Sequence, residues 1–305
     1  MDYYIGIDGG GTKTKAVLID DNLKIISEDI GGPSNFLVFD IDTVANSLIE
    51  LIGNVLNKGN IDSQNVKKIL LGTAGAGRKE DAERLENKLY KVAKTKSIII
   101  NNFKVESDAR IALEGAFAGK PGSILIAGTG SIMFGKDSNG KIHRVGGFGR
   151  LLGDEGSGFH IGRAGLNAVA KSFDGRANKT LLTDLVKEKF DIANSTQLIN
   201  EVYKNNFDIP QVAPLVIDAA LKGDKICTEI LNAEVDELIA HIVAMKEKIK
   251  TDVLNVSLIG GTITTDNFYA EKFRNKINEL PKVKLKEAEL PPDMGAALLA
   301  KENNL

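Results

Sequence analysis

The sequence predicts an α/β protein whose second half repeats the plan of the first. Three strand-like segments at the start are followed by alternating helix-like and strand-like segments, and a second series of three begins after residue 122. Three antiparallel strands followed by alternating helices and strands are typical of a ribonuclease-H-like layer. We therefore expect two ribonuclease-H-like domains, for which 305 residues are sufficient.

In the first half, strand-like patterns precede and separate two helices. The strand-like runs are residues 3–7, 13–20, 24–30, 69–71 and 97–100. Residues 42–56 have the 3.6-residue period of a helix and place Val44, Leu48 and Ile52 on one face. Residues 79–93 form a second helix-like segment with charge on its outer face.

The second half repeats the series. Strands are expected at residues 123–127, 131–136, 141–145 and 253–261, and helices at 227–250 and 293–301. Glycine and proline at residues 119–122 interrupt the chain, so we expect a boundary there. The predicted domains are residues 1–118, joined by the C-terminal helix 293–305, and residues 119–292. The helix at 293–301 is rich in Gly and Ala, which permits close packing against another backbone.

The long helix at 227–250 carries an apolar stripe. Its members are Leu231, Val235, Leu238, Ile242, Met245 and Ile249. This heptad-like spacing permits a partner helix, but packing in the core of the second domain is the favoured interpretation.

Composition excludes several classes of function. The chain has 39 basic and 41 acidic residues, a net charge of −2, which gives no electrostatic basis for nucleic-acid binding. No apolar run of about 18 residues is present, so we expect no membrane partner and a cytoplasmic location. Cys227 is the single cysteine, which excludes an intrachain disulfide, a cysteine zinc site and a self-contained iron–sulfur site.

The most informative segment is residues 8–14, DGGGTKT, between two strand-like runs. A glycine-rich hairpin tip that exposes amides and one carboxylate suits a magnesium-bound polyphosphate. A Walker loop and a dinucleotide fingerprint both require a helix after the glycines, whereas residues 13–20 alternate like a strand. An ordinary tight hairpin remains the alternative for this segment alone.

Five segments in order carry a family resemblance. They are residues 8–14, 107–109 (SDA), 126–131 (IAGTGS), 258–262 (LIGGT) and 293–298 (DMGAAL). They resemble the first phosphate, first connecting, second phosphate, adenosine and second connecting segments of the sugar kinase, heat-shock chaperone and actin superfamily. The resemblance spans almost the whole chain. It implies two actin-like ATPase domains with a central cleft.

One further segment makes the resemblance specific to one family within this superfamily. It is residues 146–158, GGFGRLLGDEGSG. The run is similar to the signature of the N-acetylglucosamine and N-acetylmuramic acid kinases of the BadF/BadG/BcrA/BcrD ATPase family. Residues 32–35, GPSN, are similar to the sugar-binding turn of that family. Phe148 stands where the mammalian enzymes have tryptophan, and Arg150 occupies a position that varies. We take the Leu151-Leu152 pair as an anchor of this loop.

The resemblance implies ATP-dependent phosphorylation of an amino sugar at its 6-hydroxyl, with ATP and Mg²⁺ as cofactors and a homodimer as the assembly. Asp108 is the expected catalytic base, although Ser107 or Asp108 can equally cap the helix that follows. Asp8 is expected to hold magnesium. The expected ATP and phosphate ligands are Gly10, Gly11, Thr12, Lys13, Gly128, Thr129, Gly130, Gly260 and Gly261. The expected sugar ligands are Asn35, Asp108, Ser131, Gly147, Phe148, Gly149 and Asp154.

Four alternatives remain to be weighed. A glucosamine kinase or a broad hexokinase would have the same fold. An ATP-driven activator of acyl-CoA reductases or dehydratases needs two cysteines per chain, which Cys227 alone does not provide. A winged-helix repressor needs an N-terminal extension and a cysteine cluster, which the sequence lacks. A non-catalytic actin-type scaffold would not need Asn35 and Asp154.

Overall fold

The computed structural model describes residues 1–76 and 79–302. The chain divides into two compact units, residues 1–121 with the segment from residue 287 onward, and residues 122–286. In the described residues each unit contains one five-stranded sheet, and the orders are β3-β2-β1-β4-β5 and β10-β9-β6-β7-β8. The chain is a two-domain actin-like fold of the α/β class.

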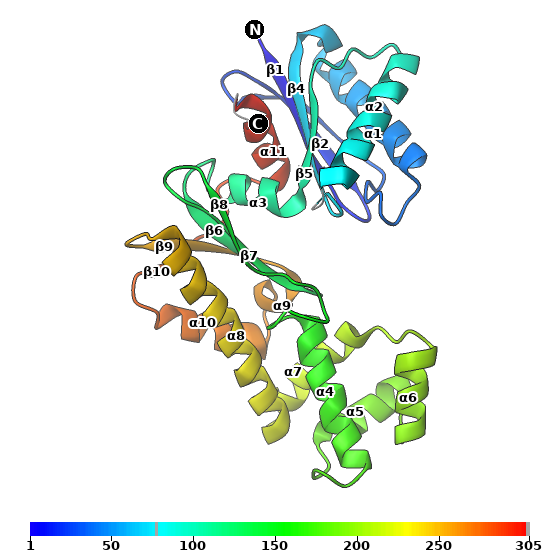
Figure 1. Ribbon diagram of the computed structural model, residues 1–305, viewed down its shortest axis with the longest axis vertical. Coiled ribbons are helices and arrows are strands. Elements are labelled where there is room, and N and C mark those ends of the chain that lie inside the picture. Colours follow the sequence, from blue (N-terminus) through cyan, green and yellow to red (C-terminus); the bar gives the residue numbers. More distant parts are fainter. Residues whose placement is uncertain (77–78, 303–305) are drawn as a thin grey trace. The chain divides into compact units, whose positions relative to one another are not determined.

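The first unit begins with an antiparallel hairpin series and continues with parallel strands (Figure 1). β1 (Tyr3–Gly9), β2 (Thr14–Asp20) and β3 (Ile25–Gly31) are antiparallel. β4 (Val66–Thr73) and β5 (Phe103–Ser107) run parallel to β1. A short 3₁₀ turn, Ser63–Asn65, precedes β4.

Helices cover both faces of this first sheet. α1 (Ile41–Gly59) and α2 (Lys79–Thr95) pack on one face, and the largest core of the unit lies beneath them. α3 (Asp108–Ala116) and α11 (Pro292–Lys301) pack on the other face (Figure 1). Glycine permits the close approach of α11 to the sheet: a Cβ on Gly6 would lie 2.3 Å from the Ala297 nitrogen.

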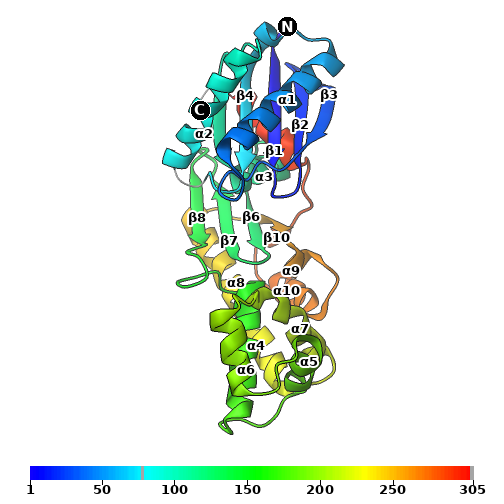
Figure 2. The same ribbon diagram turned by 90° about the vertical axis from the view of Figure 1, so that its right-hand side faces the viewer.

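The second unit repeats the strand plan. β6 (Gly122–Ala127), β7 (Ser131–Lys136) and β8 (Ile142–Gly146) are antiparallel, while β9 (Leu254–Ile259) and β10 (Val283–Leu285) extend the sheet in parallel from β6. Figure 2 shows β8, β7, β6 and β10 in this order across the unit. The predicted repetition of the first half is confirmed.

The helices of the second unit surround one large core. They are α4 (Gly158–Phe173), α5 (Leu181–Phe190), α6 (Ser195–Lys204), α7 (Ala213–Leu221), α8 (Lys225–Ile249), α9 (Gly261–Thr264) and α10 (Phe268–Asn278), with a 3₁₀ turn at Ile209–Val212. The apolar stripe of α8 packs into this core, which confirms the core-packing interpretation of the heptad-like spacing.

One predicted strand is wrong. Residues 97–100 form a turn and an extended connection, and the fifth strand is β5. Ser97 has a φ of 56°, and the Ile98 N–H donates to the Ala93 carbonyl at the end of α2. Ile98 and Ile100 pack against the core from this connection. The apolar run therefore reflects a packed loop rather than a strand.

The compact units also differ from the predicted domains at their edges. Residues 287–292, expected in the second domain, lie in the first unit. Their backbone explains this, because the N–H groups of Glu289 and Leu290 donate to the carbonyls of Ala116 and Gly115 at the end of α3.

Candidate functional site

The carboxyl ends of three parallel strands meet at one edge of the first sheet. Gly9 of β1 pairs with Thr73 of β4, and Thr73 pairs with Ser107 of β5. Asp8 and Asp108, each adjacent to one of these residues, are therefore brought to the same edge. Ligands of open α/β sheets bind at this edge.

The glycine-rich hairpin ends at this edge. Gly9 pairs with Thr14, and the Gly10 N–H donates to the Lys13 carbonyl at 3.0 Å, which closes the turn. Gly11, Thr12 and Lys13 are exposed at its tip. A Cβ on Gly11 would meet nothing within 4 Å, so this backbone is open to a ligand.

The turn at residues 32–35 is tied to this hairpin. The Ser34 N–H donates to the Gly10 carbonyl at 3.1 Å, and the Thr14 hydroxyl donates to the Gly32 carbonyl at 2.6 Å. The Thr73 hydroxyl lies 3.3 Å from the Ser34 carbonyl, to which it donates. The expected phosphate hairpin and the expected sugar turn therefore form one hydrogen-bonded assembly.

Asn35 has a structural role in its own turn. Its Oδ1 accepts a hydrogen bond from the Leu37 N–H at 3.1 Å, and its carbonyl accepts from Val38 and Phe39. This is the local geometry of an Asx turn. The side-chain oxygen is used within the turn, so the Nδ2 amide is the group on Asn35 suited to a ligand.

Asp108 is the first residue of α3, and it is exposed. Ser107 is the N-cap, because its hydroxyl accepts the Arg110 N–H at 3.2 Å. Asp108 Oδ1 accepts the N–H of its neighbour Ala109 at 2.8 Å. Of the two capping residues considered from the sequence, Ser107 is the one used, and the Asp108 carboxylate remains accessible.

Asp8 lies in a field of like charge. Burial raises the pKa of its carboxyl group, and the carboxylates of Asp293 and Asp108 raise that pKa further, whereas Lys13 and Lys15 lower it. Lys15 Nζ lies 3.2 Å from Asp293 Oδ2 and 2.9 Å from Glu28 Oε2. From the sequence, Asp293 was expected only as part of the second connecting segment, and Lys15 had no expected role. The feature of the sequence that could have indicated Asp293 is its position in the first turn of the helix expected at residues 293–301.

In the second unit, the loop between β6 and β7 is fixed at both sides. The Gly128 carbonyl accepts the Gly158 N–H at 2.8 Å and the Thr262 hydroxyl at 3.0 Å. The Thr129 carbonyl accepts the Phe159 N–H at 3.2 Å. The expected second phosphate loop is thus joined to the N-terminus of α4 and to α9.

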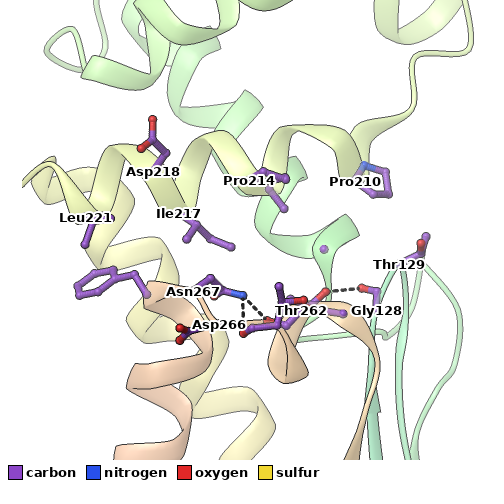
Figure 3. A pocket seen from close by; sticks show the side chains of 15 residues that line it. Gly128, Thr129, Pro210, Pro214, Ile217, Asp218, Leu221, Thr262, Asp266 and Asn267 are labelled. Atoms are coloured by element: carbon purple, nitrogen blue, oxygen red, sulfur yellow. Dashed lines mark hydrogen bonds between the residues drawn. The ribbon is translucent and has the colours of Figure 1, made fainter.

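A cavity of about 700 Å³ opens beside this loop (Figure 3). Pro214 and Ile217 of α7 lie on one side, and Thr262 of α9 lies on the other. Gly128, Thr129 and Gly261 also line it. Apolar walls with a glycine-rich floor at a strand end suit a nucleoside and its phosphates.

Gly260 has a different position from Gly261. It has a φ of 99°, and a Cβ on it would lie 2.4 Å from the Ala127 carbonyl oxygen. Glycine is therefore required where β9 turns away from β6. Gly261, one residue later, lines the large cavity.

A second cavity of about 330 Å³ is lined by residues that include Gly130, Arg150 and Asp154. Asp154 has a φ of 66°, in the left-handed region. Its Oδ1 accepts the Gly149 N–H at 3.2 Å, and its Oδ2 lies 2.8 Å from the place of a Cβ on Gly130. The structure thus brings Asp154 next to the second phosphate loop.

The middle of the loop at residues 146–158 is exposed. Leu151 and Leu152 are 85% and 82% exposed, so the expectation that this pair anchors the loop is wrong. Phe148 is 69% exposed, and the Arg144 guanidinium lies 5.4 Å from the centre of its ring. Gly147 packs on Ile132, which would lie 2.3 Å from a Cβ there. Ser131 is buried, and its hydroxyl donates to the Glu155 carbonyl at 2.5 Å.

Comparison with known sequences identifies the relatives of this chain. The profile of the BadF/BadG/BcrA/BcrD ATPase family matches residues 5–300. The chain belongs to the BadF/BadG/BcrA/BcrD ATPase family. It is 35% identical, over 99% of both chains, to an N-acetylmuramic acid/N-acetylglucosamine kinase from Clostridium acetobutylicum. It is 32% identical, over 97% of both chains, to an N-acetyl-D-glucosamine kinase from Dictyostelium discoideum.

A solved structure shares the fold of this family member. It comes from Chromobacterium violaceum, and N-acetylglucosamine kinase activity has been proposed for that protein. The TM-score is 0.71 at 23% identity, and the match covers 99% of both chains. The sequence relationships make the present chain an ATP-using sugar kinase within the family.

Two features are absent from the described part of this kinase. None of its helices is long and apolar enough to cross a membrane. No three or more His, Cys, Asp and Glu side chains in residues 1–76 and 79–302 are grouped as ligands of a metal ion. A metal held mainly by water and phosphate requires only one or two carboxylates, and Asp8 offers one in a field that favours a nearby cation.

Proposed function

We propose that the protein transfers the γ-phosphoryl group of ATP to the 6-hydroxyl of N-acetylglucosamine, of N-acetylmuramic acid, or of both. The observation that carries the proposal is the single strand edge at which the glycine hairpin, the turn at residues 32–35 and the accessible carboxylate of Asp108 meet. Relatives named for these two sugars support the choice of substrate.

Each residue of the first unit has a defined task in this proposal. The amides of Gly11 and Thr12 hydrogen-bond the β- and γ-phosphates. Asp108 orients the 6-hydroxyl and accepts its proton late in a loose phosphoryl transfer. Asp8 would hold Mg²⁺ through water, and the ion would neutralise charge on the phosphates. The Nδ2 amide of Asn35 donates to a sugar hydroxyl.

The second unit supplies the remaining contacts. The 700 Å³ cavity holds the adenosine between α7 and α9, with Gly261 on its floor. The Gly128 N–H donates to the Gly130 carbonyl at 2.9 Å, so Thr129 and the Gly130 amide are the groups that bind phosphate oxygens. Asp154 accepts hydrogen bonds from sugar hydroxyls, and Phe148 provides an apolar surface for the acetyl group.

Other expectations rest on the family resemblance alone. They are a homodimer and a role in cell-wall recycling; a cytoplasmic location was expected from the lack of a long apolar run in the sequence. The two predicted domains, residues 1–118 with 293–305 and residues 119–292, also remain part of the proposal, although residues 119–121 and 287–292 belong to the first compact unit. Light scattering at several protein concentrations tests the dimer.

Identification of the product tests the proposed reaction. After incubation with ATP, magnesium and N-acetylglucosamine, phosphorus–proton correlation spectroscopy should place the phosphate on carbon 6. The 6-deoxy sugar should give no phosphorylated product. A phosphate at the anomeric carbon, or turnover of the 6-deoxy sugar, would show that the acceptor hydroxyl is assigned wrongly.

A further inference from the structure

The backbone that carries Asp154 is held at each of three successive residues. The Ser157 N–H donates to the Asp154 carbonyl at 3.2 Å, and the Ser131 hydroxyl donates to the Glu155 carbonyl at 2.5 Å. The Gly156 N–H donates to Glu234 Oε2 at 2.7 Å, and the Tyr269 hydroxyl donates to the Gly156 carbonyl at 2.9 Å. Side chains of β7, α8 and α10 therefore converge on this short segment.

Gly156 is enclosed by these partners. Its φ is 80°, and a Cβ on it would lie 2.3 Å from the Leu238 side chain of α8. Tyr269 is fully buried, and the Glu234 side chain is 13% exposed. The N–H and the carbonyl of Gly156 are thus both bound to side chains of the core.

Glu234 is an unusual residue for this position. Burial raises the pKa of its carboxyl group; the Gly156 N–H and His160 lower that pKa, Glu237 raises it, and Arg163 lowers it. His160 Nδ1 lies 3.7 Å from Glu234 Oε1. A buried carboxylate is costly unless it is hydrogen-bonded, and a neutral apolar residue would serve the core better. The Glu234 carboxylate has a specific interaction here, because it accepts the hydrogen bond from the Gly156 N–H.

The contacts at Gly156 constrain Asp154, which lies two residues earlier in the chain. Asp154 adopts a left-handed φ that is unfavourable for a non-glycine residue, and such conformations persist only where the surroundings hold them. That conformation directs the Asp154 carboxylate between Gly130 and Gly149. The exposed middle of the loop offers no comparable packing, since Leu151 and Leu152 are exposed.

We propose that Glu234 and Tyr269 are positioning residues, which hold Gly156 so that Asp154 is presented to the sugar. The inference rests on the proposed function, because it takes Asp154 as a sugar ligand. If Tyr269 only stabilised the fold, its substitution would lower stability, and its effect on sugar binding would not depend on Asp154. The two roles are therefore separated by the coupling between Tyr269 and Asp154 in sugar binding.

The test is a double-mutant cycle on sugar affinity. Calorimetry gives the Kd of N-acetylglucosamine and of ATP for the wild type, Tyr269→Phe, Asp154→Ala and the double variant. Tyr269→Phe removes one hydroxyl and should weaken sugar binding roughly fivefold to tenfold, the effect of one hydrogen bond. ATP affinity without sugar should change less than about twofold. In the Asp154→Ala background the same change should have almost no effect on the sugar Kd.

Two further variants control for stability. Tyr90 also makes a main-chain hydrogen bond, accepting the Phe103 N–H at 2.8 Å in the first unit. Tyr90→Phe should lower the melting temperature and leave the sugar Kd unchanged. Glu234→Gln keeps an oxygen acceptor for the Gly156 N–H and should retain sugar affinity within about threefold, whereas Glu234→Ala should not.

The outcomes separate the two proposals. Equal weakening by Tyr269→Phe in both backgrounds would overturn the positioning role, as would an unchanged sugar Kd in the single variant. If the wild type bound no amino sugar, the proposed function would fail. Amide hydrogen exchange would then test whether Glu234 holds Gly156: unchanged protection of the Gly156 N–H in Glu234→Ala would refute it.

Discussion

At the scale of single residues, the capping and catalytic roles at the start of α3 belong to different side chains. Ser107 caps the helix, and Asp108 follows it with an exposed carboxylate. Sequence alone left both residues as capping candidates, because either type is common at an N-cap. The geometry now allows Asp108 to be changed without removing the cap.

Asp108→Asn should therefore separate activity from stability. We expect turnover to fall by about 10² to 10⁴, the usual contribution of a general base. The melting temperature should stay within about 2 °C of the wild type, since the Ser107 cap remains. Ser107→Ala is the matched variant, and it should cost about 1 kcal/mol of stability. An Asp108→Asn enzyme with more than about a tenth of normal turnover would limit Asp108 to a structural role.

Asp8→Asn should also separate activity from stability. Burial and the neighbouring carboxylates disfavour its charge, so Asp8→Asn should leave the metal-free protein as stable as the wild type, or more stable. The same variant should lose most magnesium-dependent turnover. Thermal unfolding in chelator and kinase assays over a magnesium series measure both effects. A markedly lower melting temperature would indicate that the carboxylate serves the fold.

At the scale of elements, two glycines of the first unit give contrasting packing tests. A Cβ on Gly6 of β1 would lie 2.2 Å from the Asp293 carbonyl oxygen, whereas a Cβ on Gly53 of α1 would meet Ile98 at 3.4 Å. Gly6→Ala should therefore displace α11 and cost about 1–3 kcal/mol or more. Gly53→Ala should be neutral or stabilising by up to about 1 kcal/mol. Denaturant unfolding of the two variants gives both values, and equal effects would refute the close packing of α11.

The pH dependence of stability tests the burial of Glu234 in α8. Its pKa is raised in the folded protein, so the folded state binds more protons than the unfolded state above the ordinary glutamate pKa of about 4.3. Stability contributed by this group is present at low pH and falls as the pH rises through the raised pKa. The free energy of unfolding of Glu234→Gln should thus gain on the wild type over this interval. A difference independent of pH from 4 to 8 would contradict the raised pKa.

At the scale of the whole molecule, short-range patterns predicted more than long-range contacts. The glycine hairpin and the repeated order of strands follow from local spacing and turn residues. Contacts such as Tyr269 with Gly156, 113 residues apart, leave no local pattern. The anchoring expected of Leu151 failed for a related reason, because apolar character alone does not fix whether a loop residue finds a core to pack in.

The acceptor of the phosphoryl group can be identified with one assay. The direct measurement is ADP release, with ATP and magnesium, in the presence of N-acetylglucosamine, N-acetylmuramic acid, glucosamine, glucose or no sugar. We expect release to depend on sugar and to be fastest, by kcat/KM, with one or both N-acetylated sugars. Fastest turnover of glucosamine or glucose would favour those alternatives. ADP release at the same rate without sugar, or none with any of the four, would contradict the assignment as an amino-sugar kinase.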